Sequence, residues 1–205
     1  MTTTINIWDN SKIIDSHLHF GTIANFDMPE TMLINTMANY KIKFGVVSNI
    51  ELIEFESDGA KATNSLGQIE GNQKTIDLIK KYPNKLKGLF WIKPNSEGLT
   101  DNVKKFIIDN KNYFVGLKIH PFHSNLAVTD DKYKPYFDFA KQQGLIVAVH
   151  TATDIYSKSD FVYEVAKIYS DVNFILVHMD MASYHEKAIQ YVKELPNLYG
   201  DTTWF

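Results

Sequence analysis

The sequence predicts an α/β protein in which short parallel strands alternate with helices within one domain. Short apolar runs rich in β-branched residues recur along the 205 residues, and a longer amphipathic segment with helical spacing follows nearly every run. Such alternation is typical of consecutive strand–helix units around a parallel sheet, because parallel strands need a long crossover connection. We therefore expect about seven strands and six helices in a single domain that covers residues 1–205.

Seven segments have the length and composition of buried strands. They lie at residues 12–20, 44–50, 86–94, 114–121, 145–152, 173–180 and 198–204. Side chains alternate between the two faces of a strand, which predicts that Asp15, His17 and His19 share one face of the first strand. Its opposite face then carries the apolar residues Ile14, Leu18 and Phe20.

Six segments between these strands have helical spacing of apolar residues. They lie at residues 29–42, 68–83, 99–110, 131–144, 159–170 and 183–196. Pro29 suits the start of the first, Pro83 ends the second and Gly144 ends the fourth, while Ser159 and Ser183 are suitable N-caps of the last two. The long connection at 48–68 has two interpretations, a substrate-facing loop or a mobile surface loop.

The composition excludes several classes of protein. Apolar residues make up 44% of the chain, charged residues 22%, and the net charge of −3 comes with no basic stripe that would bind nucleic acid. Apolar runs stay shorter than the ~18 residues of a membrane span, and residues 1–10 do not resemble a secretory signal, so we expect a cytoplasmic protein. Cysteine is absent, so imidazole and carboxylate groups would have to hold any transition metal.

Histidine is concentrated where the predicted strands end. Of the seven histidines, five lie at carboxyl ends of strands: His17, His19, His120, His150 and His178. A single strand-end histidine is most often a hydrogen-bonded structural group. Parallel strands of a barrel open on one common face, however, so this set would converge there, and converging imidazoles form a good site for zinc, manganese or iron.

Lys118 and His120 lie on the same face of the fourth strand, together with Gly116, whereas Val115, Leu117 and Ile119 are expected to pack toward helices. Lys118 has three interpretations: a carbamylated metal bridge, a cation that binds a substrate carboxylate, or the partner of a neighbouring acid. His120 is expected to contact the substrate or to support the metal ligands.

These motifs resemble the amidohydrolase superfamily. The segment IIDSHLHFG (13–21) resembles its His-x-His first strand, and GLKIHP, IVAVHTA, FILVHMD and NLYGDTTW resemble, in order, strands 4 to 7 of its amidohydrolase-related branch. That branch includes the aminocarboxymuconate-semialdehyde and resorcylate decarboxylases as well as hydrolases. The resemblance implies a TIM-type (β/α) barrel with one divalent metal, most commonly zinc. It also implies that His17, His19 and His150 are metal ligands and that His178 acts on the metal-bound water, as a base or as an additional ligand. Apart from the resemblance, we assign Lys118 and His120 to substrate binding.

One family feature is missing. An aspartate at the end of strand 8 is a metal ligand in the family, and no such segment follows Trp204 and Phe205. Asp201 is expected on strand 7 and is not expected to replace it. We therefore expect an incomplete barrel whose chain is truncated at its C-terminal end. The alternatives are a homo-oligomer in which a second subunit completes the barrel, and a degenerate relative.

The function that these features favour is a metal-dependent hydrolase. It would activate a water molecule and cleave an ester, lactone or amide bond in a small, carboxylated substrate. The alternatives are a nonoxidative decarboxylase with the same ligands and a non-catalytic barrel that binds a metal or ligand. Four aromatic residues near strand ends would either stack on an aromatic substrate or pack in the core: Phe20, Trp91, Phe122 and Trp204.

Overall fold

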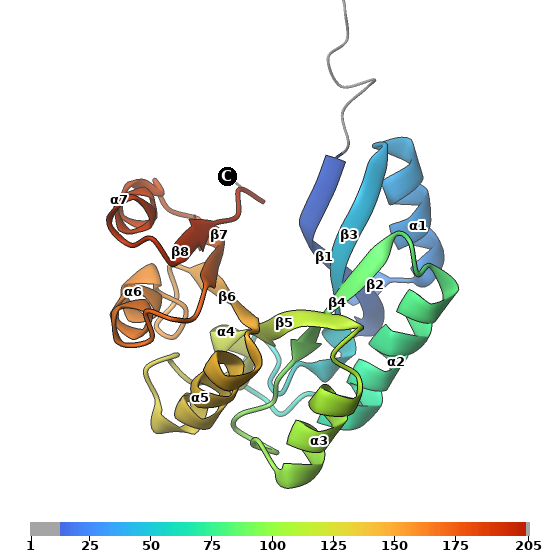
Figure 1. Cartoon of the computed structure of the whole chain (residues 1–205), viewed down its shortest axis with the longest axis horizontal. Coiled ribbons are helices and arrows are strands. Elements are labelled where there is room, and N and C mark those ends of the chain that lie inside the picture. The colour runs from blue at the N-terminus through green and yellow to red at the C-terminus, as the bar shows by residue number, and fades with distance from the viewer. Residues whose placement is uncertain (1–12, 204–205) are drawn as a thin grey trace, which may run out of the picture.

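A single curled sheet forms the centre of the molecule (Figure 1), which we describe from a computed structural model for residues 13–203. Its strands are β1 (Ile13–Ile23), β2 (Phe26–Met28), β3 (Ile42–Asn49), β4 (Leu86–Trp91), β5 (Phe114–Ile119), β6 (Ile146–Ala152), β7 (Phe174–Met181) and β8 (Leu198–Gly200). They are ordered β2-β1-β3-β4-β5-β6-β7-β8, and every neighbouring pair is parallel except the β1–β2 hairpin. The seven predicted parallel strands are confirmed.

The longer helices cover the outer face of this sheet (Figure 1), whereas the short helix at residues 121–124 lies at the carboxyl end of its preceding strand. The helices are α1 (Glu30–Asn39), α2 (Gln68–Lys81), α3 (Asp101–Asp109), α4 (Pro121–Ser124), α5 (Lys134–Gln143), α6 (Ser159–Ile168) and α7 (Glu186–Glu194), with short 3₁₀ turns at Ile50–Leu52 and Asp131–Tyr133. In the described part of the chain β1 and β8 are not paired, and the curled sheet stays open between them. This is the incomplete TIM-type barrel expected from the sequence.

The main hydrophobic core lies between the sheet and the helices. Leu117 and Ile119 of β5 are fully buried there beside Ile107 of α3 and Phe137 of α5, as the alternation predicts. Val115 was expected on the same face but packs inside the curl against the cluster of Leu89, Ala148 and Val177. The cause is a register shift in the β4–β5 pairing between Gly88 and Leu89, which changes the phase of alternation.

The first strand also departs from simple alternation. Leu18 and Phe20 pack against Leu33 of α1, as expected, but Ile14 is 67% exposed and does not share their environment. Two register shifts in the β1–β3 pairing, one next to Ile14, explain the difference. The strand also continues to Ile23 and forms a hairpin with β2, which the sequence reasoning did not predict.

Helix ends follow the sequence only in part. Gly144 ends α5 in the left-handed conformation, at φ +66°, as predicted. The caps proposed for the last two helices are wrong, because Lys158 precedes α6 and a left-handed His185 precedes α7. Residues 1–12 and Trp204, which the predictions also used, lie outside the described residues. Within the described part, no helix is long and apolar enough to cross a membrane.

Candidate active site

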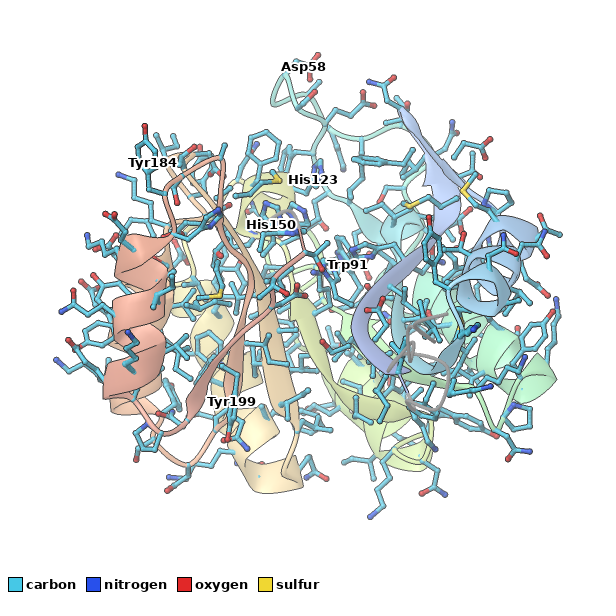
Figure 2. All side chains as sticks on the ribbon, turned by 90° about the horizontal axis from the view of Figure 1, so that it is seen from above. Asp58, Trp91, His123, His150, Tyr184 and Tyr199 are labelled. Atoms are coloured by element: carbon cyan, nitrogen blue, oxygen red, sulfur yellow. The ribbon has the colours of Figure 1, made fainter. Side chains whose placement is uncertain are left out.

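All five strand-end histidines meet in one cavity of about 820 Å³ at the carboxyl ends of the strands. Figure 2 shows His150 and His123 close together at the end of the molecule where the loop carrying Asp58 lies, with Trp91 deeper and Tyr199 at the opposite end. His123, on α4, also lines the cavity. The convergence predicted for the histidines is therefore what the fold produces.

His17 and His19 form the closest pair in this cluster. Their Nε2 atoms are 2.8 Å apart, so both rings present the same nitrogen to one point. The opposite nitrogen of each ring faces another part of the sheet: Nδ1 of His19 is 2.9 Å from Oγ of Ser48, at the end of β3. Nδ1 of His17 is 3.0 Å from Oδ2 of Asp201, just after β8, without the alignment of a regular hydrogen bond.

Both imidazoles are uncharged at neutral pH. Burial, followed by the charge of Lys118, lowers the pKa of His17 to about 4 and holds the pKa of His19 well below its usual range. The same two causes rank first for His150, and burial is also the largest cause for His120, whose pKa is likewise well below the usual range. A buried neutral imidazole keeps a lone pair for a metal ion or a proton.

Lys118 lies beneath the histidines and is fully buried. Its Nζ is 3.2 Å from Nε2 of His17, and it is not among the side chains that line the cavity. Burial lowers its pKa to about 7, against the opposing effect of the Asp201 carboxylate. Its assignment to the substrate therefore stays a prediction, and its observed contact is with His17.

His178 sits where the backbone of β7 leaves the regular strand conformation. Its φ is +69°, and Met179 and Asp180 follow with positive φ as well. Nδ1 of His178 is 3.0 Å from the carbonyl oxygen of Thr203. Because a carbonyl can only accept, Nδ1 carries the hydrogen and Nε2 is left as an acceptor. Burial lowers the pKa of His178, which favours this neutral form.

His150 and His120 form a stack over Trp91. The His120 and His150 ring centroids are 3.9 Å apart, and Trp91 stacks on the other side at 5.6 Å from His120. The ring of His178 lies 5.0 Å from His150 and 5.0 Å from His17, so it links the two parts of the cluster. Trp91 itself is 1% exposed and supports the cavity from below.

The His17–His19 pair is suited to supply two ligands of a divalent metal. Its neutral Nε2 atoms are directed to one point, and a polar neighbour lies beside the far nitrogen of each ring. Among residues 13–203, however, no three His, Cys, Asp or Glu side chains are placed together to hold a metal ion. The proposed third ligand, His150, stays a prediction.

Sequence reasoning gave Ser48 and His123 no role in the cavity, and it did not foresee the contact of Asp201 with His17. Ser48 and Asp201 directly end or follow strands, so the strand-end rule that selected the histidines could have found them. Among the aromatic candidates, Phe122 lines the cavity and Phe20 packs in the core, while Trp204 lies outside the described residues. The connection at 48–68 faces the cavity through Ile50, Ile53, Glu56 and Ser57.

Solved structures with this fold were found by structural comparison, whereas the search of curated proteins gives no match. A probable 2-pyrone-4,6-dicarboxylic acid hydrolase from Acinetobacter baumannii is 14% identical with a TM-score of 0.64 and covers 94% of this chain and 70% of its own. An uncharacterised TIM-barrel protein from Bordetella bronchiseptica is 17% identical with a TM-score of 0.66, and the match covers 95% of this chain and 76% of that protein.

A third structure is that of a D314N mutant of 5-carboxyvanillate decarboxylase from Novosphingobium aromaticivorans, which contains bound manganese. It is 12% identical with a TM-score of 0.65, and the match covers 90% of this chain and 69% of that protein. At these identities the three structures support the fold. The sequence model of the amidohydrolase family matches residues 14–205, almost the whole chain. With the His-x-His strand and the histidine-lined cavity in place, this chain belongs to the amidohydrolase family.

Proposed function

We propose that the chain is a metal-dependent hydrolase that cleaves an ester, lactone or amide bond in a small molecule. The observation that carries the proposal is the His17–His19 pair, whose neutral Nε2 atoms lie 2.8 Å apart in the cavity. With His150 as the third protein ligand, the site would hold one divalent ion, with zinc as the first candidate and manganese or iron as alternatives. When bound, such an ion polarises a carbonyl group and lowers the pKa of water to about 7.

The protein residues have separate tasks in this reaction. His178 accepts a proton from the attacking water, because its Nε2 is unprotonated and its Nδ1–H is held by the Thr203 carbonyl. His120 lines the cavity and contacts the substrate from its stack on His150. Lys118 positions His17, whose Nε2 lies 3.2 Å from its Nζ.

Metal content and turnover test this proposal together. We expect about one zinc per chain by elemental analysis, loss of that metal in His17→Ala/His19→Ala, and zinc-dependent hydrolysis of phenyl acetate or of a simple lactone. In His178→Gln we expect the metal to be retained and kcat to fall by about 10²-fold or more, the usual contribution of a general base.

Other outcomes point to the alternative functions. Release of carbon dioxide from carboxylated phenols without ester or lactone hydrolysis would identify a decarboxylase. Bound metal with neither reaction would identify a non-catalytic barrel. Wild-type protein that is folded and binds no zinc, manganese or iron would contradict the proposal directly.

A further inference from the structure

We infer that the cavity selects a substrate with an uncharged, flat apolar body, an aromatic ester or amide, and disfavours one that carries a carboxylate at its outer end. This inference rests on the proposed hydrolase function and concerns the class of substrate. It replaces the carboxylated substrate that the sequence led us to expect. Three features of the cavity lead to it: its ring-lined floor, its apolar walls and the sign of its charges.

The imidazole rings of His120 and His150 line the floor of the cavity, and the buried Trp91 ring lies beneath them. His150 stacks on His120, with an angle of 13° between the rings, and His120 stacks in turn on Trp91. Such rings attract a flat apolar ring by stacking.

The walls above the floor are largely apolar. Phe26 and Phe122 both contact the His123 ring, with centroid distances of 6.1 and 5.2 Å. Further apolar side chains line the same cavity: Met28, Ile50, Ile53 and Met181. The ring of an aromatic substrate would find apolar contacts on these walls as well as on the floor.

The charged groups in the cavity lining are acidic. Glu56 and Asp154 are both half-buried lining residues, and no lysine belongs to the lining as the structure describes it. Arginine, the residue best suited to bidentate binding of a carboxylate, is absent from the whole sequence, since all 21 basic residues are lysines. Asp154 also affects the cavity electrostatically, because its charge opposes the burial that lowers the pKa of His123.

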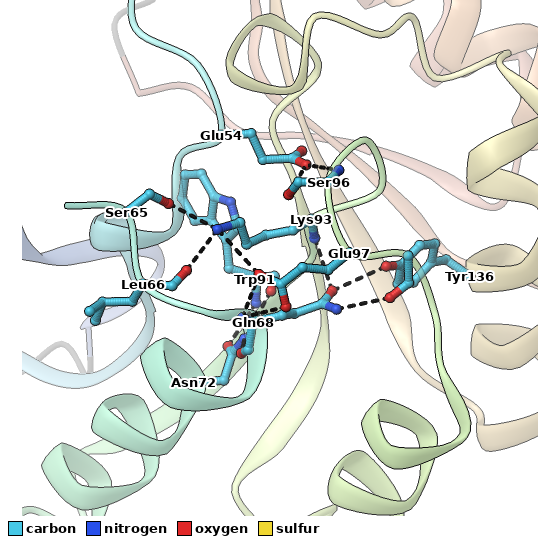
Figure 3. A network of polar contacts seen from close by, with 11 residues as sticks. Glu54, Ser65, Leu66, Gln68, Asn72, Trp91, Lys93, Ser96, Glu97 and Tyr136 are labelled. Carbon is cyan, nitrogen blue, oxygen red and sulfur yellow. Dashed lines mark hydrogen bonds and ion pairs between the residues drawn. The ribbon is translucent and has the colours of Figure 1, made fainter. Parts of the chain in front are cut away.

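The loop that carries Glu56 is fixed in place. The backbone N–H groups of Glu54 and Phe55 donate to the His123 carbonyl, and His123 Nδ1 donates back to the Phe55 carbonyl at 2.7 Å. Farther along, Figure 3 shows Lys93 reaching Ser65 and the Leu66 carbonyl, at 2.9 and 2.7 Å.

Glu54 anchors the same loop from within. Its Oε1 accepts from both the N–H and the hydroxyl of Ser96, at 2.6 and 2.7 Å (Figure 3). The backbone on both sides of Glu54 is therefore held in place, and Glu56 lines the cavity from this anchored segment. A substrate carboxylate at the outer end would be repelled by both acids and would find no cation in the lining.

Binding of three amides that differ only in the para substituent tests the inference without needing turnover. The probes are para-toluamide, which is neutral, para-carbamoylbenzoate, which is anionic, and para-(aminomethyl)benzamide, which is cationic. Dissociation constants are measured by chemical-shift titration of the zinc-loaded chain at low ionic strength. We expect the anionic probe to bind about tenfold more weakly than the neutral one and the cationic probe at least as tightly as the neutral one.

Charge variants assign the effect to its source. In Glu56→Gln/Asp154→Asn the penalty for the anionic probe should fall to about threefold or less, while affinity for the neutral probe is retained. The change at Asp154 is conservative, because an asparagine oxygen can still accept from the N–H groups of Tyr156 and Ser157. Asp58→Asn is the matched control, since Asp58 is an exposed acid of the same loop that is not a lining residue, and it should leave the penalty unchanged.

The outcomes separate this inference from the proposed function. Equal or tighter binding of the anionic probe overturns the inference, and so does failure of para-toluamide to bind. Selective binding without hydrolysis of the matching phenyl esters would support the inference and contradict the hydrolase. Hydrolysis with a preference for anionic esters would support the hydrolase and contradict the inference.

Discussion

The properties of each cavity histidine depend on what lies behind its ring. Nδ1 of His19 faces the Ser48 hydroxyl, Nδ1 of His17 faces the Asp201 carboxylate, and Nδ1 of His178 faces the Thr203 carbonyl. Each contact fixes ring orientation and leaves Nε2 for the cavity. Metal-binding histidines are commonly held in this way, and loss of such a partner typically weakens metal binding 10- to 100-fold.

Asp201→Asn is therefore expected to weaken zinc binding by about 10- to 100-fold. The asparagine oxygen can still accept from the Thr203 N–H, as Oδ1 of Asp201 does at 2.7 Å, so the local turn is kept. Its amide group replaces the carboxylate oxygen that faces His17. Competition with a chromophoric chelator gives the affinity, and Asp154→Asn serves as the charge-matched control. Unchanged affinity in Asp201→Asn would show that Asp201 does not support the site.

A second prediction at this scale concerns packing under the site. A Cβ atom added at Gly116 would overlap the backbone oxygen and Cγ1 of Ile146, and backbone cannot move aside as a flexible side chain can. Gly116→Ala should therefore lower the free energy of unfolding by about 1–3 kcal/mol, the usual cost of overpacking. Urea denaturation measures it. Gly67→Ala, whose new Cβ would meet only Oε1 of Glu97 at 4.0 Å, should cost less than about 1 kcal/mol.

Among the elements, β7 is the one whose geometry decides the site. Val177 pairs with His150 and packs inside the curl, so regular alternation would turn His178 toward the helices. Instead the positive φ angles of residues 178–180 reverse the phase, and pairing resumes two residues out of register, with Ala152 opposite Met181. Left-handed backbone at three consecutive non-glycine residues is strained and needs support from its surroundings.

Thr151 supplies part of that support from β6. Its buried hydroxyl donates to the Val177 carbonyl at 2.8 Å and accepts from the Asp180 N–H at 2.9 Å, so it joins the strand on both sides of His178. The Asp180 carboxylate in turn accepts from the N–H and hydroxyl of Ser159 at the start of α6. The strained segment is thereby held to two neighbouring elements.

Thr151→Val should disturb the position of His178 without changing the shape of the side chain. It removes the hydroxyl that donates to the Val177 carbonyl and accepts from the Asp180 N–H, which is expected to cost about 1–3 kcal/mol of unfolding free energy. If hydrolysis is confirmed, kcat should fall more than KM rises, since His178 moves while the ligand pair does not. Thr151→Ser keeps the hydroxyl and should restore both properties. Failure of serine to restore kcat would contradict the positioning role.

Some features of the fold and of the site can be predicted from the sequence, and others depend on contacts between segments. Strand and helix positions follow from periodicity, and the common direction of parallel strands places the strand ends that carry His17, His19, His150 and His178 at one end of the sheet. The face of the sheet on which each side chain lies cannot be predicted in this way. Register shifts beside Ile14 and between Gly88 and Leu89 depend on pairing with a neighbouring strand. The β1–β2 hairpin and the role of Asp201 likewise depend on contacts between distant segments.

At the scale of the whole molecule, the histidine cluster links the free energy of folding to pH. The cluster draws on strands from β1 to β7, so the neutral histidines are buried together only when the sheet is complete. An unfolded chain exposes each histidine to water and lets it titrate near its ordinary pKa. For His17 that value is 6.5, against about 4 in the folded protein.

The metal-free protein should therefore lose stability as the pH falls from 6.5 toward 4. In that range the unfolded chain binds a proton at residue 17 that the folded chain does not, so protonation favours unfolding by on the order of 3 kcal/mol across the window. Above pH 6.5 both states are neutral at His17 and its contribution is constant. Urea unfolding in the presence of a chelator, at several pH values, measures the slope. His17→Asn removes one titrating group, so its stability should fall less steeply between pH 6.5 and 4 than that of the wild type. Parallel slopes for the two proteins would show that His17 is not buried in its neutral form and would undermine its assignment as a metal ligand.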